Sequence, residues 1–137
     1  MICMPLSGAK KILLTEEDTV VRDGLAKLLK KDGYQITKAS SSSELIKQIN
    51  AGSFDLILVD VHLGQPEGIE VLKVLKDTKP GIPILVMVSH TSGGIVEKAL
   101  KEGVIDYLIK PFNITTIKKK IAKILKDNQP KQGEMST

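Results

Sequence analysis

Residues 55–63 read Asp-Leu-Ile-Leu-Val-Asp-Val-His-Leu, and this stretch decides the fold. The apolar residues Leu56 to Val59 follow one another without a break, and an aspartate comes directly after them. An unbroken apolar run of this length is typical of a strand that is buried on both faces, as strands are in parallel sheets. Similar runs recur at residues 12–14, 84–88 and 108–109.

Segments with helical spacing separate these runs. Their apolar residues recur at intervals of three and four, which indicates amphipathic helices that each bury one stripe. Residues 34–37 alternate apolar and polar side chains, so we expect an edge strand there. Strands that alternate with helices in this way predict an α/β fold, a doubly wound five-stranded parallel sheet with helices on both faces. The expected stripes are Val20, Val21, Leu25, Leu28 and Leu29; Leu45, Ile46 and Ile49; Val71, Leu72 and Leu75; Ile95, Val96, Ala99 and Leu100; and Ile114, Ile117, Ile121, Ile124 and Leu125.

Capping residues predict where several of these helices begin and end. Gly33 is expected to end the first helix, because glycine is favoured just past a helix end. Ser42 or Ser43 is expected to cap the second helix, and Asn113 the last. Gly93-Gly94 opens the fourth helix weakly, because glycine in a helix interior costs roughly 1 kcal/mol relative to alanine.

The composition narrows the class of protein. The chain has 137 residues, enough for one domain that buries roughly two-thirds of its surface. We expect this domain over residues 10–127, with the polar residues 128–137 as a disordered tail or the start of a linker. Cys3 is the single cysteine, which excludes an intrachain disulfide, and no apolar run reaches the roughly 20 residues that cross a bilayer. A cytoplasmic protein without a membrane partner is therefore expected.

The net charge of +4 favours nucleic acid as a partner, but its distribution does not. Residues 1–112 hold 14 basic and 14 acidic side chains, whereas residues 113–137 hold six lysines against Asp127 and Glu134. Aromatic residues make up only 3% of the chain, too few for the stacking platforms that bind single-stranded nucleic acid. We predict no direct nucleic-acid binding by this domain. The excess charge is interpreted as a solvated helix face or, alternatively, as a surface that docks an acidic partner.

Chemically active side chains follow the strands at their carboxyl ends, where open parallel sheets place their functional sites. Glu16-Glu17-Asp18 follows the first strand, Asp60 ends the third, Ser89-His90 follows the fourth and Lys110-Pro111 the fifth. A group of carboxylates without cysteine suits Mg²⁺, which binds one or two carboxylates, waters and phosphate oxygens. An ammonium and a hydroxyl at the same edge suit a phosphoryl group.

Four motifs, in this order along the chain, resemble the receiver domain of bacterial two-component response regulators. They are Ile-Leu-Leu-Thr-Glu-Glu-Asp (12–18), the stretch 55–63, Ile-Leu-Val-Met-Val-Ser (84–89) and Tyr-Leu-Ile-Lys-Pro-Phe (107–112). The resemblance covers about residues 10–127. It implies a flavodoxin-like (βα)5 fold with the strand order 2-1-3-4-5, which flavodoxin and the chemotaxis receiver share.

The resemblance implies a phosphoryl acceptor at Asp60. The phosphoryl donor would be a sensor histidine kinase or a phosphotransfer protein. Glu16, Glu17 and Asp60, together with the backbone carbonyl of His62, match the ligands of a Mg²⁺ cofactor. Lys110 matches the lysine that offsets charge on the transferred group.

The remaining motif positions imply how a signal would leave the domain. Ser89 matches the switch hydroxyl, which also belongs to the catalytic set, and Tyr107 matches the aromatic residue that turns inward on activation. Pro111 would follow a cis peptide bond. The implied output is altered partner binding, including a possible homodimer, at the face formed by the fourth helix, the fifth strand and the fifth helix. Such a protein is not a turnover enzyme, although it catalyses its own phosphorylation and dephosphorylation.

Several positions depart from the pattern of that family and leave alternatives open. Glu17 stands where a shorter metal ligand is usual, and Gly64 where proline is usual. One alternative is a degenerate receiver that acts as a phosphorylation-independent protein interaction module. A small flavodoxin-like enzyme or cofactor binder is another, although no Gly/Ser/Thr-rich phosphate loop follows the first strand. His62 and His90 with the carboxylates would suit Zn²⁺ or Mn²⁺, whereas the resemblance gives His62 a role in the access of water to phosphorylated Asp60.

Overall fold

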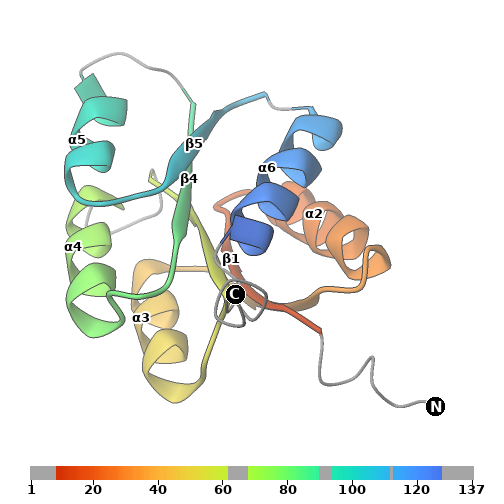
Figure 1. Ribbon diagram of the computed structural model, residues 1–137, viewed down its shortest axis with the longest axis horizontal. Helices are drawn as coiled ribbons and strands as arrows, with labels where there is room; N and C mark the ends of the chain where they lie inside the picture. Colours follow the sequence, from red (N-terminus) through yellow and green to blue (C-terminus); the bar gives the residue numbers. More distant parts are fainter. Residues whose placement is uncertain (1–8, 62–67, 90–93, 112, 128–137) are drawn as a thin grey trace, which may run out of the picture.

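The computed structural model describes residues 9–61, 68–89, 94–111 and 113–127. Strands and helices alternate along these parts of the chain (Figure 1). Within them, every helix is too short or too polar to cross a membrane. The strands are β1 Lys11–Thr15, β2 Gln35–Ala39, β3 Leu56–Asp60, β4 Ile84–Val88 and β5 Asp106–Ile109. The helices are α2 Thr19–Lys31, α3 Ser42–Ala51, α4 Gly68–Thr78, α5 Ile95–Lys101 and α6 Ile114–Asp127.

The described strands form a five-stranded sheet in the order β2-β1-β3-β4-β5, and all neighbours are parallel. This arrangement confirms the predicted fold class and strand order. β3 lies in the middle of the sheet, and every one of its residues is buried. β2 forms one edge and is partly exposed, as its alternating sequence predicts. Asp60, the last residue of β3, therefore lies at the centre of the carboxyl edge of the sheet.

Each face of the sheet has its own apolar core, because successive residues of a strand point to opposite faces. Helices α3, α4 and α5 cover one face, and α2 and α6 cover the other (Figure 1). In β3, Ile57 and Val59 point to the first core, whereas Leu56 and Leu58 point to the second. The helices contribute Leu45, Ile49, Val71, Leu72, Leu75, Val96 and Ala99 to the first core, and Leu25, Ala26, Leu29, Ile117, Ile121, Ile124 and Leu125 to the second.

Two of the predicted helix stripes are partly wrong. In α2 the buried residues are Leu25, Ala26 and Leu29, whereas Val20 is 81% exposed. Val20 lies in the first turn of α2, ahead of the first residue that reaches the core. In α5, a helix of only seven residues, Leu100 is 45% exposed because the buried positions are limited to Val96 and Ala99. The predicted stripe residues Val21 and Leu28 are each 37% exposed.

Ser41 caps α3, so the prediction of Ser42 or Ser43 was wrong. Ser41 has the extended backbone that an N-cap requires, with φ −151° and ψ 166°. Its Oγ accepts a hydrogen bond from the backbone N of Glu44 at 3.1 Å, and Ser42 is buried instead. Asn113 caps α6 as predicted, because its side chain accepts hydrogen bonds from backbone N–H groups in the first turn.

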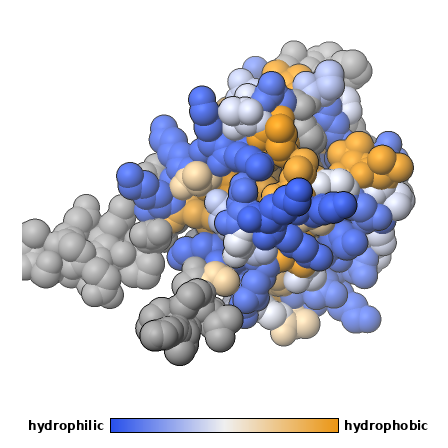
Figure 2. Space-filling model, turned by 90° about the vertical axis from the view of Figure 1, so that its right-hand side faces the viewer, coloured by the Kyte–Doolittle hydropathy of each residue, from blue (hydrophilic) through white to orange (hydrophobic). Residues whose placement is uncertain are grey.

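Exposed lysines lie on the solvent-facing sides of α2 and α6, and those of α6 belong to the segment 113–137 that carries the excess charge. Figure 2 shows the side of the molecule that lies on the right in Figure 1, where α2 and α6 are found, and its surface is largely hydrophilic. These lysines lie on the sides of α2 and α6 that face away from the second core. Exposed lysines on these helices are Lys27, Lys30, Lys31, Lys119, Lys123 and Lys126.

Gly33 ends α2 in a left-handed conformation, with φ +96°. Its N–H donates to Lys30 O at 3.0 Å, and the N–H of Tyr34 donates to Leu29 O at 3.4 Å. These two hydrogen bonds form a Schellman motif, which satisfies carbonyls at the end of the helix. Gly24 lies inside the same helix, and a Cβ atom there would meet no other atom within 4 Å.

Alanine at these two glycines is expected to change stability in opposite directions. Gly33→Ala should lower the free energy of unfolding by about 1–2 kcal/mol, because an L side chain is strained in the left-handed region. Gly24→Ala should raise it by about 0.5–1 kcal/mol, because alanine favours the helix interior. Urea denaturation of both variants measures the difference. A similar loss of stability in the two variants would contradict this prediction.

Candidate functional site

Lys110 lies between two buried carboxylates at the carboxyl edge of the sheet. Its Nζ donates to Asp60 Oδ2 at 2.9 Å and to Glu16 Oε2 at 3.0 Å. Asp60 is 0% exposed and Glu16 is 1% exposed, whereas the Lys110 side chain is 23% exposed. The Lys110–Pro111 peptide bond is cis, as expected. The ends of β1, β3 and β5 thus bring three of the predicted site residues into direct contact.

The charges around Lys110 decide its protonation. Burial alone lowers the pKa of an ammonium, because it penalises the charged form. Here the hydrogen bonds to Glu16 and Asp60, and the charges of these carboxylates, outweigh burial and raise the pKa of Lys110 above its usual value of 10.5. Lys110 therefore carries a positive charge at neutral pH.

One carboxylate oxygen of Glu16 could accept a further hydrogen bond. Glu16 Oε1 is buried and, among the described residues, accepts no hydrogen bond. Lys110 Nζ is only 2.8 Å away, so this contact is an ion pair without the direction of a hydrogen bond. Buried oxygens without a hydrogen bond are rare because they are costly.

The donor atoms fit a hard divalent cation. Carboxylate oxygens are the ligands that Mg²⁺ prefers in proteins, and Mg²⁺ uses only one or two of them, with waters completing its shell. Within the described parts of the chain, no three His, Cys, Asp or Glu side chains are grouped as a metal site. Among the described residues, Glu16 and Asp60 contribute buried carboxylate oxygens of this kind at the edge of the sheet.

The loop after β1 holds Glu16 at both its main chain and its side chain. Arg22 Nη1 donates to Glu16 O at 2.9 Å, and the N–H of Asp18 donates to Glu16 Oε2 at 3.1 Å. Asp18 also caps α2, because its Oδ1 accepts from the backbone N of Val20 at 2.9 Å and of Val21 at 3.2 Å. The third acid of the motif therefore fixes the loop, while the first acid lies in the site.

Asp60 is held at its main chain and at its carboxylate. Thr15 Oγ1 donates to Leu58 O at 3.2 Å and accepts from Asp60 N at 3.0 Å. The N–H of Glu17 donates to Asp60 Oδ2 at 3.3 Å. Neither Thr15 nor Arg22 was predicted as a site residue. Thr15 continues an apolar run and Arg22 lies in a helix, so their residue types alone do not mark them.

The other predicted site residues differ in their exposure and in their position relative to Lys110, Asp60 and Glu16. Glu17 is exposed, and its backbone rather than its side chain contacts Asp60. Ser89 directly follows β4 and is half-buried, so it lies at the same edge of the sheet. The residues His62, Gly64, His90 and Gly93 lie outside the described residues.

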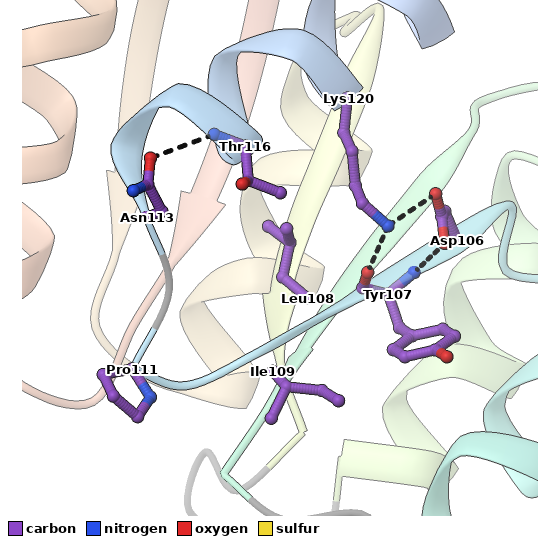
Figure 3. Close-up of a pocket in the computed structure, with 8 residues that line it drawn as sticks. All are labelled: Asp106, Tyr107, Leu108, Ile109, Pro111, Asn113, Thr116 and Lys120. Atoms are coloured by element: carbon purple, nitrogen blue, oxygen red, sulfur yellow. Dashed lines mark hydrogen bonds and ion pairs between the residues drawn. The ribbon is translucent and has the colours of Figure 1, made fainter.

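Tyr107 lies in β5 and is half-buried beside Lys120 (Figure 3). Lys120 Nζ donates to Asp106 Oδ2 at 2.9 Å and to Tyr107 O at 3.0 Å, and lies 5.4 Å from the centre of the Tyr107 ring. The N–H of Tyr107 donates to Asp106 Oδ1 at 2.7 Å. Side chains thus satisfy the main chain of this edge strand at Tyr107, which protects the open edge from pairing with another strand.

A pocket of about 330 Å³ lies between β5 and the start of α6 (Figure 3). Leu108 points from β5 toward α6, whereas the Tyr107 ring lies on the other side of the strand. Glu16 and Asp60 do not line this pocket, so it is separate from the charged group. Its lining residues are Asp106, Tyr107, Leu108, Ile109, Pro111, Asn113, Thr116 and Lys120.

Lys120→Met is expected to lower the free energy of unfolding by about 1 kcal/mol. The change removes an ion pair and a hydrogen bond, but both partners are about one-third exposed, which limits the contribution. Lys119→Met is the matched control, because Lys119 is the exposed neighbour on the same helix. Urea denaturation should show almost no loss for the control. Equal losses in both variants would show that the Lys120 contacts are not stabilising.

The described residues combine a five-stranded parallel sheet with a buried aspartate, a buried glutamate and a lysine in contact at its carboxyl edge. The chain belongs to the response regulator receiver domain family, whose family model matches residues 12–122. Members of this family signal through phosphorylation, generally bind Mg²⁺, and interact with histidine kinases and phosphotransfer proteins. They are not classical enzymes.

Relatives of known name agree with this assignment. The transcriptional regulatory protein ZraR of Escherichia coli K12 is 35% identical over 114 residues, which cover 83% of this chain and 26% of ZraR. The DNA-binding transcriptional regulator NtrC of Rhizobium meliloti is 32% identical over 112 residues, covering 82% of this chain and 23% of NtrC. The chain thus spans about a quarter of the length of these relatives.

Solved structures give the same result for the fold. A receiver domain protein described as CheY-like, from Methanospirillum hungatei JF-1, superposes with a TM-score of 0.85 at 27% identity, covering 88% of this chain and 97% of that chain. A two-component response regulator from Clostridium difficile superposes with a TM-score of 0.82 at 29% identity, covering 85% and 96%.

Proposed function

We propose that this chain accepts a phosphoryl group on Asp60 from a sensor histidine kinase or a phosphotransfer protein, in a reaction that depends on Mg²⁺. One observation carries the proposal: a fully buried carboxylate ends the central strand 2.9 Å from Lys110 Nζ, beside a second buried carboxylate, that of Glu16. Such an arrangement is costly for folding alone, because two buried like charges share one partly exposed ammonium.

The transfer exchanges one bond to phosphorus for another. A bond forms between a carboxylate oxygen of Asp60 and phosphorus, while the bond from phosphorus to the histidine nitrogen of the donor breaks. The electron pair of that bond stays on the nitrogen, which is protonated by water. Because the transition state of phosphoryl transfer is loose, positioning and charge neutralisation contribute more than the strength of the nucleophile. Lys110, charged and held close to Asp60, supplies part of this neutralisation.

The metal ligands proposed for this site are Glu16, Glu17, Asp60 and the backbone carbonyl of His62. When bound, Mg²⁺ would offset charge on the phosphoryl oxygens. The buried oxygen Glu16 Oε1, which accepts no hydrogen bond among the described residues, supports the assignment. Glu17 is exposed and follows Glu16 directly, so its carboxylate is accessible to a cation at this edge.

Ser89 and Tyr107 are proposed to change their packing after phosphorylation. A phosphoryl group adds nearly two negative charges at the end of β3, and Ser89 follows the neighbouring strand β4. The output face would be formed by α5, β5 and α6, where partner binding or homodimer formation would be altered. Exposed apolar side chains of Leu100, Ile105 and Ile109 are found on this part of the chain. Hydrolysis of the aspartyl phosphate by water would end the signal.

Intact-mass spectrometry after incubation with acetyl phosphate tests the proposal. In the presence of Mg²⁺ the chain should gain the mass of one phosphoryl group, and EDTA should prevent the gain. Hydroxylamine, which cleaves acyl phosphates, should remove the added mass. A chain that gains no mass at any Mg²⁺ concentration would refute phosphoryl acceptance and favour the interaction module.

A further inference from the structure

Thr15 is a buried polar residue to which none of the roles above assigns a function. It is the last residue of β1 and is 0% exposed. The register between β1 and β3 extends as far as the pair Leu14 and Leu58. Beyond this pair, the hydroxyl of Thr15 connects β1 to the main chain of β3. It donates to Leu58 O at 3.2 Å and accepts from Asp60 N at 3.0 Å.

The chemistry of threonine suits this double contact. A hydroxyl has one proton to donate and lone pairs that accept, so a single side chain can satisfy a carbonyl and an N–H together. The branched Cβ restricts χ1, which keeps the hydroxyl in one place. Valine has nearly the same shape but would leave both main-chain groups of β3 without this partner, and buried groups of this kind cost about 1–3 kcal/mol each.

We propose that Thr15 is a positioning residue for phosphoryl acceptance. Its hydroxyl fixes the main chain of Asp60, while Lys110 Nζ and the N–H of Glu17 hold the carboxylate. The acceptor is thus held at both ends, and the carboxylate is kept in line for attack. This inference rests on the proposed function of Asp60. It concerns the rate of transfer, because a displacement of about 1 Å in a reacting group can lower a rate on the order of 100-fold.

Two substitutions at Thr15 separate positioning from general stability. Thr15→Val removes the hydroxyl, and Thr15→Ser keeps it. With acetyl phosphate and Mg²⁺, Thr15→Val should lower the maximal rate of phosphorylation by about tenfold or more, with little change in the half-saturating acetyl phosphate concentration. Thr15→Ser should stay within about threefold of wild type. Ile121→Val, a buried substitution in α6 far along the chain from the site, is the control for lost stability and should leave the rate unchanged.

Hydrogen exchange of the Asp60 amide adds a readout that needs no phosphorylation. The amide should be protected in wild type and in Thr15→Ser, and should exchange faster in Thr15→Val. If Thr15→Val does not fold, Thr15→Cys replaces it. Cysteine is of similar size but has only a weak S–H donor, so the same loss of phosphorylation rate is expected. A wild-type rate in the hydroxyl-free variant, or equal losses in Thr15→Ser and Thr15→Val, would overturn the proposal. A wild-type chain that is never phosphorylated would instead refute the function of Asp60, and the exchange data would still report the Thr15 contact.

Discussion

Asp60→Asn is expected to abolish phosphorylation. The amide has nearly the same size as the carboxylate, but it carries no negative charge and its oxygen is a poor nucleophile for phosphorus. Intact mass after incubation with acetyl phosphate and Mg²⁺ should therefore remain that of the unmodified chain. The fold should be kept, because the substitution leaves Glu16 and Lys110 as a buried pair of opposite charge. Urea denaturation of the variant checks this condition.

Asp55→Asn is the matched control for this substitution. Asp55 stands just before β3, at the opposite end of the strand from Asp60, and its Oδ2 accepts from the backbone N of Lys11 at 2.8 Å. The control should gain a phosphoryl group as wild type does. Equal gains in Asp60→Asn and wild type would place the acceptor at another residue.

Lys110→Met is expected to impair both phosphorylation and stability. Removing the ammonium leaves two buried carboxylates together, and breaking a buried ion pair costs about 3–5 kcal/mol, with the lower end expected here because Lys110 is partly exposed. The phosphorylation rate should fall on the order of 100-fold, because a positioned charge at the reacting group is lost. Urea denaturation and the acetyl phosphate assay measure the two effects. Unchanged values in both would show that Lys110 serves neither purpose.

The pH dependence of stability should distinguish wild type from Lys110→Met. Because the folded state raises the pKa of Lys110, its contribution is fully present below the usual value of 10.5 and is lost as the pH rises through the raised value. Wild type should thus lose stability above this pH more steeply than the variant. Lys118→Met, which breaks a surface pair with Asp32 at 3.5 Å, should cost less than about 1 kcal/mol at any pH.

The fold could be predicted from the sequence because the inner strands β1, β3 and β4 are short and almost entirely buried. A run such as Leu56 to Val59 has no polar residue that would allow an exposed face, so it requires a parallel sheet with helices on both sides. The site followed from the fold, because strand ends in such a sheet meet at one edge. Asp60, Lys110 and Glu16 were all predicted in this way, and the structure brings them into contact.

The details that were missed depend on choices between equivalent residues. Several consecutive serines could cap α3, but Ser41 is the one whose Oγ accepts from the backbone N of Glu44, whereas Ser42 is buried. Glu16 and Glu17 are identical in type, but only Glu16 is buried. Lys118 to Lys120 form a continuous run, and the spacing of the helix brings Lys120 to Asp106. Side-chain orientation in three dimensions, rather than residue type, decides each case.

The burial of β3 on both faces has a mechanical consequence. Protein interiors are packed about as densely as organic crystals, so a central strand that touches both cores cannot shift to accommodate a new group at its end. If Asp60 is phosphorylated, we therefore expect the middle of the sheet to stay in place and its rim to move, where Gly94 precedes α5 and β5 has one open side. The centre of the sheet would thus stay rigid, and only the surface at α5 and β5, which a partner would contact, would change its shape.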